Sequence, residues 1–238
     1  MADNDYILPV MDTVKEAWAK VNGFKGVVWG FLILAYIALI ILVAVNNQIH
    51  GALHALGGIL TQLLGCAMMW VLLYMGILRA LGRPVNLAVT SYLLQPKMFA
   101  YLVGAYLIKT VIPGIIIGLS VVLIMFVGQS HFMATLIIFL AVIVVFYVLM
   151  RMYLIVDFVL MNDMNPIAAL QASLKATQFN VVSLMGLTLL NLLLYIASII
   201  PLGIGLIWFV PYIQVCFGEV YKKLVVDRAP IPSPVKDN

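Results

Sequence analysis

MFAYLVGAYLIKTVIPGIIIGLSVVLIMFV, at residues 98–127, is an apolar run whose only charged side chain is Lys109. A helix rises about 1.5 Å per residue, so about twenty residues cross a hydrocarbon core of about 30 Å. The chain of 238 residues is 65% hydrophobic and 9% charged, whereas soluble domains are about half apolar and about a quarter charged. Because no water-soluble fold can bury so much apolar surface, the composition predicts an all-α integral membrane protein.

Apolar runs of similar length divide the rest of the chain. The segment before the first run, residues 1–26, is polar and contains four acidic residues, unlike the basic start and small-residue cleavage site of a secretory signal. We therefore expect the first run to stay in the mature protein. The prediction is one polytopic domain, with an N-terminal segment at 1–26, a six-helix bundle at 27–224 and a tail at 225–238. The six predicted transmembrane helices cover residues 27–45, 55–78, 98–127, 132–160, 181–200 and 205–224.

Positive charge outside the spans is confined to alternate connecting segments. Lys or Arg residues precede the first span, lie in the second and fourth loops and follow the sixth span, whereas residues 46–54, 128–131 and 201–203 contain no Lys, Arg, Asp or Glu. By the positive-inside rule, both termini and the charged loops are cytoplasmic. These charges lie at span ends, where attraction to anionic lipid head groups explains them. We therefore expect membrane lipids as partners and no nucleic acid.

The uncharged loops are short, so the spans are expected to pair into three tight hairpins. Each hairpin is expected to follow a short amphipathic helix at the cytoplasmic interface. The clearest of these helices starts at Asn165 and Pro166, since Asn caps free amides and Pro tolerates the first helical position. The apolar spacing of that helix, at Ile167, Leu170 and Leu174, recurs at Met11, Val14 and Trp18 and at Val85, Ala88 and Tyr92.

This recurrence predicts three copies of one unit, an interfacial helix followed by a hairpin. Aligning the copies without gaps brings Gly30, Gly104 and Gly186 to one position. A shared glycine predicts close helix contact around a pseudo-threefold centre, because small residues let helix backbones approach one another in lipid. The alternative is coincidence, since apolar helices resemble one another.

The segment RMYLIVDFVLMNDMNPIAALQASLKATQFN, at residues 151–180, resembles a recurring segment of uncharacterised bacterial six-helix membrane proteins. In these proteins a span ends near an acidic residue, and a short loop opens an amphipathic helix that leads into the next span. They include the membrane domain fused to some glycerophosphodiester phosphodiesterases. The resemblance implies this fold and a bacterial inner-membrane location. It implies no phosphodiesterase activity, because the soluble catalytic domain has no counterpart in the sequence.

Ionisable residues inside the predicted spans are costly in lipid and are functional candidates by default. Lys109 precedes Pro113, and this proline could break the helix beside the cation, as in the discontinuous helices of transporters. The alternative is that the helix is continuous and the Lys109 side chain extends to the inner interface. Arg151, Asp157 and Glu219 lie at similar depth, so the four charges could form one cluster that binds an anionic head group or relays a proton. The structural alternative is that they neutralise one another and fix the helix register.

Uncharged polar residues in the spans favour packing over chemistry. Gln62, Asn191 and Gln214 are expected to bond neighbouring helices. The three histidines of the chain fall on the predicted outer side, with no carboxylate or cysteine nearby to complete a coordination shell. We therefore predict no metal site and no cofactor.

The sequence contains no motif of a hydrolase or a nucleotide-binding protein, so we predict no enzyme activity. The leading hypothesis is a scaffold or accessory subunit of an envelope or membrane complex, with a membrane-protein partner or a second copy of the chain bound to its abundant apolar surface. The alternative is a small transporter or lipid-binding protein, in which the ionisable residues face a cavity open to the cytoplasmic side. A third hypothesis, an enzyme acting on a lipid, would require polar groups around a lipid linkage.

Overall fold

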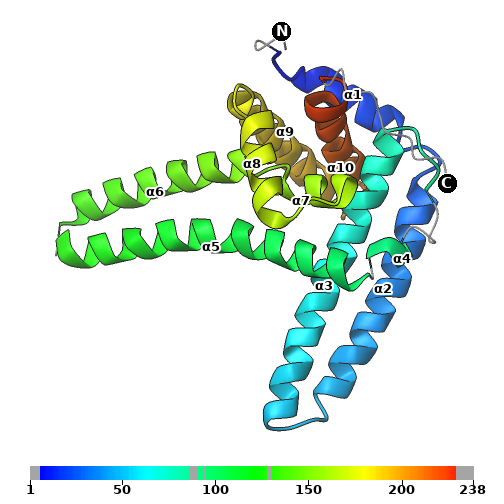
Figure 1. Ribbon diagram of the computed structural model, residues 1–238, viewed down its shortest axis with the longest axis horizontal. Coiled ribbons are helices and arrows are strands. Elements are labelled where there is room, and N and C mark those ends of the chain that lie inside the picture. The colour runs from blue at the N-terminus through cyan, green and yellow to red at the C-terminus, as the bar shows by residue number, and fades with distance from the viewer. Residues whose placement is uncertain (1–5, 86–89, 94, 128–129, 229–238) are drawn as a thin grey trace.

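The structure is a computed structural model that describes residues 6–85, 90–93, 95–127 and 130–228. Helices are the only regular secondary structure among these residues (Figure 1), which confirms the all-α prediction. The elements are α1 (Val10–Ala19), α2 (Lys25–Asn46), α3 (Ala52–Ala80), α4 (Thr90–Leu93), α5 (Pro96–Val127), α6 (His131–Arg151), α7 (Ile155–Asn162), α8 (Pro166–Ala176), α9 (Val181–Ile199), α10 (Leu206–Tyr221) and a π-helical turn (Lys222–Val226).

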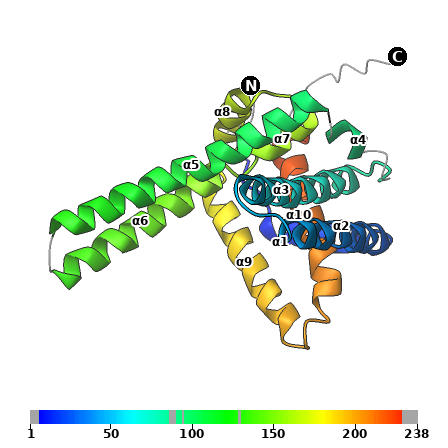
Figure 2. The same ribbon diagram turned by 90° about the horizontal axis from the view of Figure 1, so that it is seen from below.

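Three helix pairs, α2–α3, α5–α6 and α9–α10, form arms that diverge from a common base (Figures 1 and 2). The base contains α1, α7 and α8, packed against parts of α3, α5 and α10. A short helix precedes each arm in the chain, namely α1, α4 or α8. The predicted order of short helix and hairpin is therefore confirmed. Of the residues on which the repeat was based, Ala88 lies outside the described part of the chain.

Among the described residues, five helical segments are long and apolar enough to cross a membrane, so the chain is a polytopic membrane protein. They are Lys25–Asn46, Leu53–Ala80, Pro96–Val127, His131–Asn162 and Val181–Ile199. At about 1.5 Å per residue, α5 is about 48 Å long and exceeds a hydrocarbon core of about 30 Å. A helix longer than the hydrocarbon core can tilt away from the bilayer normal. Arms that diverge from one another cannot all lie along that normal, so they are tilted.

The sixth predicted span contains α10, which has only 16 residues. The first turn of α10 lies against the start of α2. There the indole Nε1 of Trp29 donates to the carbonyl oxygen of Ile207 at 3.0 Å, and Lys25 Nζ lies 5.1 Å from the centroid of the Trp208 ring. The other end of α10 contacts α1, where Glu219 pairs with Lys20. That end belongs to the base, and the crossing of the membrane by α10 stays a prediction.

The fourth predicted span, 132–160, is broken in the structure. Helix α6 ends at Arg151, a turn follows, and α7 begins at Ile155. At the break, Ser173 Oγ of α8 donates to the carbonyl oxygen of Arg151 at 2.9 Å and accepts from the amide of Leu154 at 3.2 Å. Thr177 Oγ1 donates to the same carbonyl oxygen at 3.1 Å. A side chain inserted into the helical hydrogen-bond ladder is a recognised cause of a kink, and here α8 supplies it.

The predicted contact at a shared glycine is wrong. A Cβ atom added to Gly30 or Gly186 would meet no atom within 4 Å, so neither residue supports a close helix contact. A Cβ at Gly104 would lie 2.7 Å from Cγ of Pro166 in α8, which is a contact with the base rather than with another hairpin. Close backbone packing occurs instead where α3 crosses α10.

Candidate functional site

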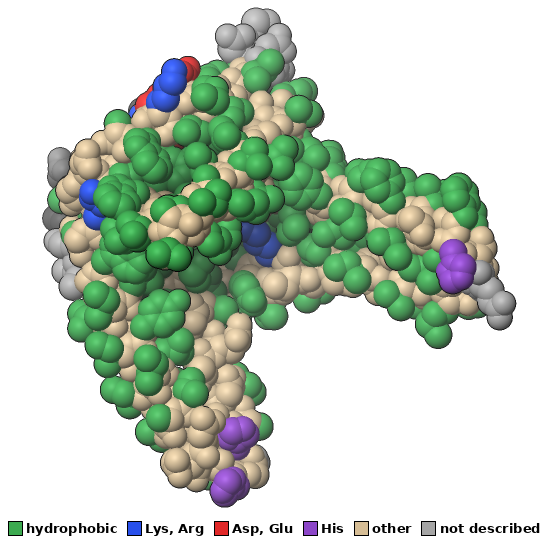
Figure 3. Space-filling view, turned by 180° about the vertical axis from the view of Figure 1, so that it is seen from behind, with side chains coloured by type: hydrophobic (Ala, Val, Ile, Leu, Met, Phe, Trp, Pro, Cys, Tyr) green, Lys and Arg blue, Asp and Glu red, His purple; other side chains and the backbone are tan. Residues whose placement is uncertain are grey.

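A cavity of about 530 Å³ lies where the α2–α3 and α5–α6 arms leave the base, with α7 and α10 closing it. Figure 3 shows a basic side chain recessed at the base of the angle between the two arms that end in histidines. The apolar side chains of those arms surround this position. The residues that line the cavity are Gln62, Gly65, Cys66, Met69, Trp70, Leu73, Tyr106, Lys109, Tyr153, Val156, Asp157, Gln214 and Phe217.

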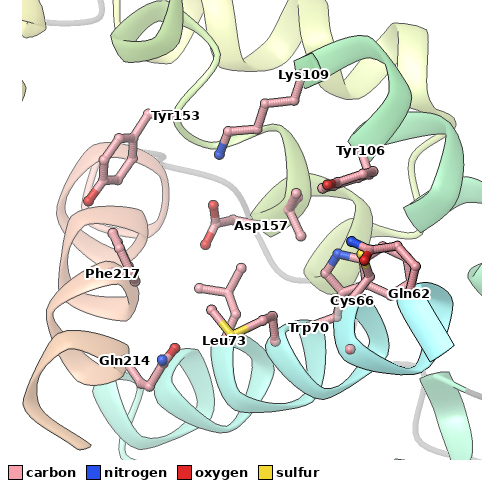
Figure 4. A pocket seen from close by; sticks show the side chains of 13 residues that line it. Gln62, Cys66, Trp70, Leu73, Tyr106, Lys109, Tyr153, Asp157, Gln214 and Phe217 are labelled. Carbon is pink, nitrogen blue, oxygen red and sulfur yellow. The ribbon is translucent and has the colours of Figure 1, made fainter. Parts of the chain in front are cut away.

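Lys109 enters this cavity from α5 (Figure 4). Of the two alternatives for this segment, a helix break beside Lys109 does not occur, because α5 continues through Pro113 to Val127. Within the described part of the chain, the ammonium group of Lys109 forms no hydrogen bond or ion pair. The Lys109 charge therefore faces the cavity without a protein partner in contact.

Asp157 lies in α7 and points into the same cavity, toward Lys109 (Figure 4). Its side chain is placed there by the break at the end of α6, because α7 starts only two residues before it. Asp157 is 3% exposed, and its Oδ1 atom has no hydrogen-bond partner. A buried acceptor without a partner costs about 1–3 kcal/mol, and more when it is charged. The fold thus holds a carboxylate with one buried oxygen that no protein group hydrogen-bonds.

The polar rim of the cavity includes residues that the sequence did not single out. Tyr106 and Tyr153 line it, and their phenol groups are visible beside Lys109 in Figure 4. Gln62 and Gln214, which were expected to bond neighbouring helices, also line the cavity. No sequence signal marks the tyrosines, because an aromatic residue in an apolar span is more often a packing residue.

Asn191 fulfils the structural expectation. Its Oδ1 accepts a hydrogen bond from Tyr212 Oη at 2.7 Å, which joins α9 to α10. Both residues are buried. The prediction that Asn191 bonds a neighbouring helix is confirmed.

The predicted four-residue cluster is wrong for Glu219 and Arg151. Glu219 is fully buried but pairs with Lys20 of α1 and lies 3.8 Å from Lys222. Arg151 does not line the cavity, and only its carbonyl oxygen takes part in the hydrogen bonds at the α6–α7 break. The structure therefore brings together Lys109 and Asp157 alone.

The ion pairs of Glu219 belong to the contact of α1 with α10. Lys20 also donates to the carbonyl oxygen of Ala80 at 2.6 Å, and Lys223 donates to Glu16 at 2.6 Å. That hydrogen bond lowers the pKa of Glu16 below its ordinary value. These contacts fix α1 to the ends of α3 and α10, which is a structural role.

The histidines lie at the arm tips, away from the cavity (Figure 3). His54 Nδ1 is 3.0 Å from the carbonyl oxygen of Asn46, so it is engaged with the end of α2. Within the described ranges, no group of three or more His, Cys, Asp or Glu side chains could hold a metal ion.

Comparisons of the chain with protein families, curated proteins and solved structures gave no match. The resemblance of residues 151–180 to bacterial six-helix membrane proteins therefore stays a prediction. The cavity between α3, α5, α7 and α10 is the candidate site.

Proposed function

We propose that this membrane protein binds a lipid, with the polar head group in the cavity beside Lys109 and Asp157. This proposal is carried by two groups that face one cavity between two apolar arms. One is a buried carboxylate oxygen without a hydrogen-bond partner, and the other is a lysine that forms no hydrogen bond or ion pair with the described residues. Charges that served only to fix helix register would pair directly, because an unpaired charge in a membrane interior is costly. A ligand with polar groups of its own would offset that cost.

The dimensions and surroundings of the cavity support this proposal. Its volume of about 530 Å³ falls within the range of about 300–1,000 Å³ found for small-molecule sites. The arms that flank it expose apolar side chains along their length, so an amphiphile can enter from the bilayer between them. The proposed role is binding rather than catalysis, since no described nucleophile that lines the cavity forms a hydrogen bond with a base.

The orientation in the membrane is also a proposal. Lys20, Arg79, Lys222 and Lys223 lie at the base, whereas the loops at the arm tips contain no Lys, Arg, Asp or Glu. The positive-inside rule then places the base and both termini on the cytoplasmic side. We propose the bacterial inner membrane as the location, on the resemblance of residues 151–180.

Native mass spectrometry of the protein extracted from its own membrane in mild detergent tests lipid binding. We expect a retained lipid on the wild type, and at least tenfold less of it on Lys109→Met, since contacts to charged groups contribute about 1.5–3 kcal/mol each. The control is Lys97→Met, which removes an exposed lysine of the same helix that pairs with Asp163. A bare wild-type chain, or equal lipid loss in both variants, would refute the proposal.

A second candidate role is that of a scaffold or accessory subunit. It is favoured by the divergence of the arms, which leaves apolar helix faces such as that containing Ile33, Ile37 and Ile41 exposed. A stoichiometric protein partner, or a second copy of the chain, in the same mass spectrum would support this role.

A further inference from the structure

We infer that the head group is zwitterionic, with a phosphate beside Lys109 and a primary ammonium beside Asp157. This inference rests on the proposed function and specifies its ligand. It follows from the cavity containing one cationic and one anionic side chain that point toward each other without forming an ion pair (Figure 4). A head group carrying both charges matches both residues, whereas a single charge matches one and is repelled by the other.

Asp157 discriminates between kinds of cationic group. Its buried Oδ1 lacks a hydrogen-bond donor, and satisfying that atom requires a ligand with N–H or O–H groups. An alkylammonium group has three N–H donors, as in lysine, whereas a trimethylammonium group has none. The carboxylate therefore favours ethanolamine over choline as the terminal group of the lipid.

Lys109 accounts for the phosphate. Its ammonium group is a compact cation that binds phosphate as a point charge. Among the described residues, Lys109 is the only Lys or Arg that lines this cavity. A phosphoglycerol lipid would also match Lys109, but its single negative charge would lie near the Asp157 carboxylate without a compensating cation. The pair of residues therefore favours phosphoethanolamine over phosphoglycerol.

Aromatic side chains complete the surroundings of the ammonium group. Tyr153 and Phe217 line the cavity on the side of α10 and pack together, with ring centroids 5.6 Å apart. Aromatic faces attract cations within about 6 Å, more strongly when water is excluded. This contribution supports any ammonium, so the distinction between ethanolamine and choline depends on Asp157 alone.

A second cavity provides a place for an acyl chain of the same lipid. It has a volume of about 410 Å³ and is lined entirely by apolar residues, including Phe31, Leu64 and Leu93. Trp70 lines both cavities, and its ring packs edge-on against Phe99 with centroids 5.8 Å apart. The two spaces therefore adjoin at Trp70, with the polar one suited to a head group and the apolar one to a hydrocarbon chain.

Competition between lipids tests the inference. Delipidated protein would be offered an equimolar mixture of phosphatidylethanolamine, phosphatidylcholine and phosphatidylglycerol with identical acyl chains, and the adducts would be quantified by native mass spectrometry. We expect the ethanolamine lipid to exceed each of the others about tenfold on the wild type, from one hydrogen-bonded charge contact. Asp157→Asn should reduce that preference to near parity with the choline lipid while lipid binding persists. Asp163→Asn, at an exposed acid paired with Lys97, should leave it unchanged.

The outcomes separate the inference from the proposed function. Lipid retention without an ethanolamine preference, or a preference that survives Asp157→Asn, would overturn the zwitterionic assignment and leave lipid binding intact. Binding of no lipid by a wild-type chain that remains folded would overturn both. O-phosphoethanolamine, which has the head group and no acyl chains, should displace the lipid only at large excess. Equal displacement at equal concentration would assign the cavity to a soluble phosphoamine and overturn the lipid source.

Discussion

A Cβ atom added to Gly218 of α10 would lie 2.6 Å from the carbonyl oxygen of Gly76 in α3. The approach from the side of α3 is closer still, since a Cβ at Gly76 would lie 2.2 Å from the carbonyl oxygen of Gln214. Both neighbouring atoms belong to backbone, which cannot rotate away. The two glycines therefore set the distance between α3 and α10, the helices that form two sides of the cavity.

Gly218→Ala should destabilise the protein by about 1–3 kcal/mol, the usual cost of overpacking. Gly30→Ala is the matched control, because its Cβ would meet no atom within 4 Å and alanine favours a helix by about 1 kcal/mol over glycine. Thermal unfolding in detergent, followed by circular dichroism, measures both variants. Equal stability of the two variants would contradict the close crossing of α3 and α10.

Ser173→Ala should also destabilise the protein, because it removes the side chain that bridges the break between α6 and α7. The amide of Leu154 would lose its acceptor and the Arg151 carbonyl oxygen would lose one of its donors, at a cost of about 1–3 kcal/mol for a buried unsatisfied group. The control is Ser120→Ala, whose hydroxyl donates at 2.7 Å to the Ile116 carbonyl oxygen of its own helix. A loss no greater than that of the control would indicate that the break forms without α8.

Asp157→Asn should leave delipidated protein as stable as the wild type or more stable. The substitution keeps the shape of the side chain and removes a buried charge, one of whose oxygens has no hydrogen-bond partner. For a chain of this size, each kcal/mol gained raises the melting temperature by about 2–4 °C. Unfolding of the variant in detergent would show instead that Asp157 holds the fold together, as the structural alternative requires.

Glu16 and Lys223 predict a pH dependence at the base. Their hydrogen bond lowers the pKa of Glu16 below its ordinary value of 4.5, so the folded state holds this proton less tightly than the unfolded state does. The stabilisation is complete above about pH 4.5 and is lost as the pH falls through the lowered pKa. Because the Glu16 side chain is 42% exposed, it amounts to about 0–1 kcal/mol.

The corresponding measurement compares Glu16→Gln with the wild type across pH 3–7. The variant should be the less stable protein at neutral pH, and the difference should disappear in acid. Asp12→Asn is the control, because Asp12 is an exposed carboxylate of the same helix and takes no part in the ion pairs of Glu16. The stability difference between this variant and the wild type should not disappear at low pH. A difference that persists unchanged at low pH would exclude the ion pairs as its source.

The features that depend on local composition could be predicted from the sequence. Five long apolar helices and the order of short helix and hairpin follow from the length and spacing of apolar residues. Lys109 and Asp157 stood out because a charge within an apolar run has few structural explanations. Their similar depth in the membrane allowed both side chains to lie in one site, but it did not require this.

The features that depend on remote contacts could not be predicted. The break after Arg151 is bridged by Ser173 and Thr177, which follow it in the chain by twenty residues or more. Glu219 pairs with Lys20 near the other end of the sequence. Alignment of the repeat selected Gly30 and Gly186 because it assumed that the hairpins are equivalent. In the structure they are not, since the close crossing joins α3 of the first hairpin to α10 of the third.

Site-specific photo-crosslinking tests lipid occupancy of the cavity most directly. Tyr106, which lines the cavity, would be replaced by benzoyl-phenylalanine. The control is the same replacement at Tyr147, an exposed residue of α6 outside the cavity. After irradiation in native membranes, mass spectrometry identifies the attached lipid. Lipid binding in the cavity predicts one dominant head group at position 106, lost when Lys109 is changed to Met, and a mixture resembling the bulk membrane at position 147. The same mixture at both positions, unaffected by Lys109→Met, would contradict it.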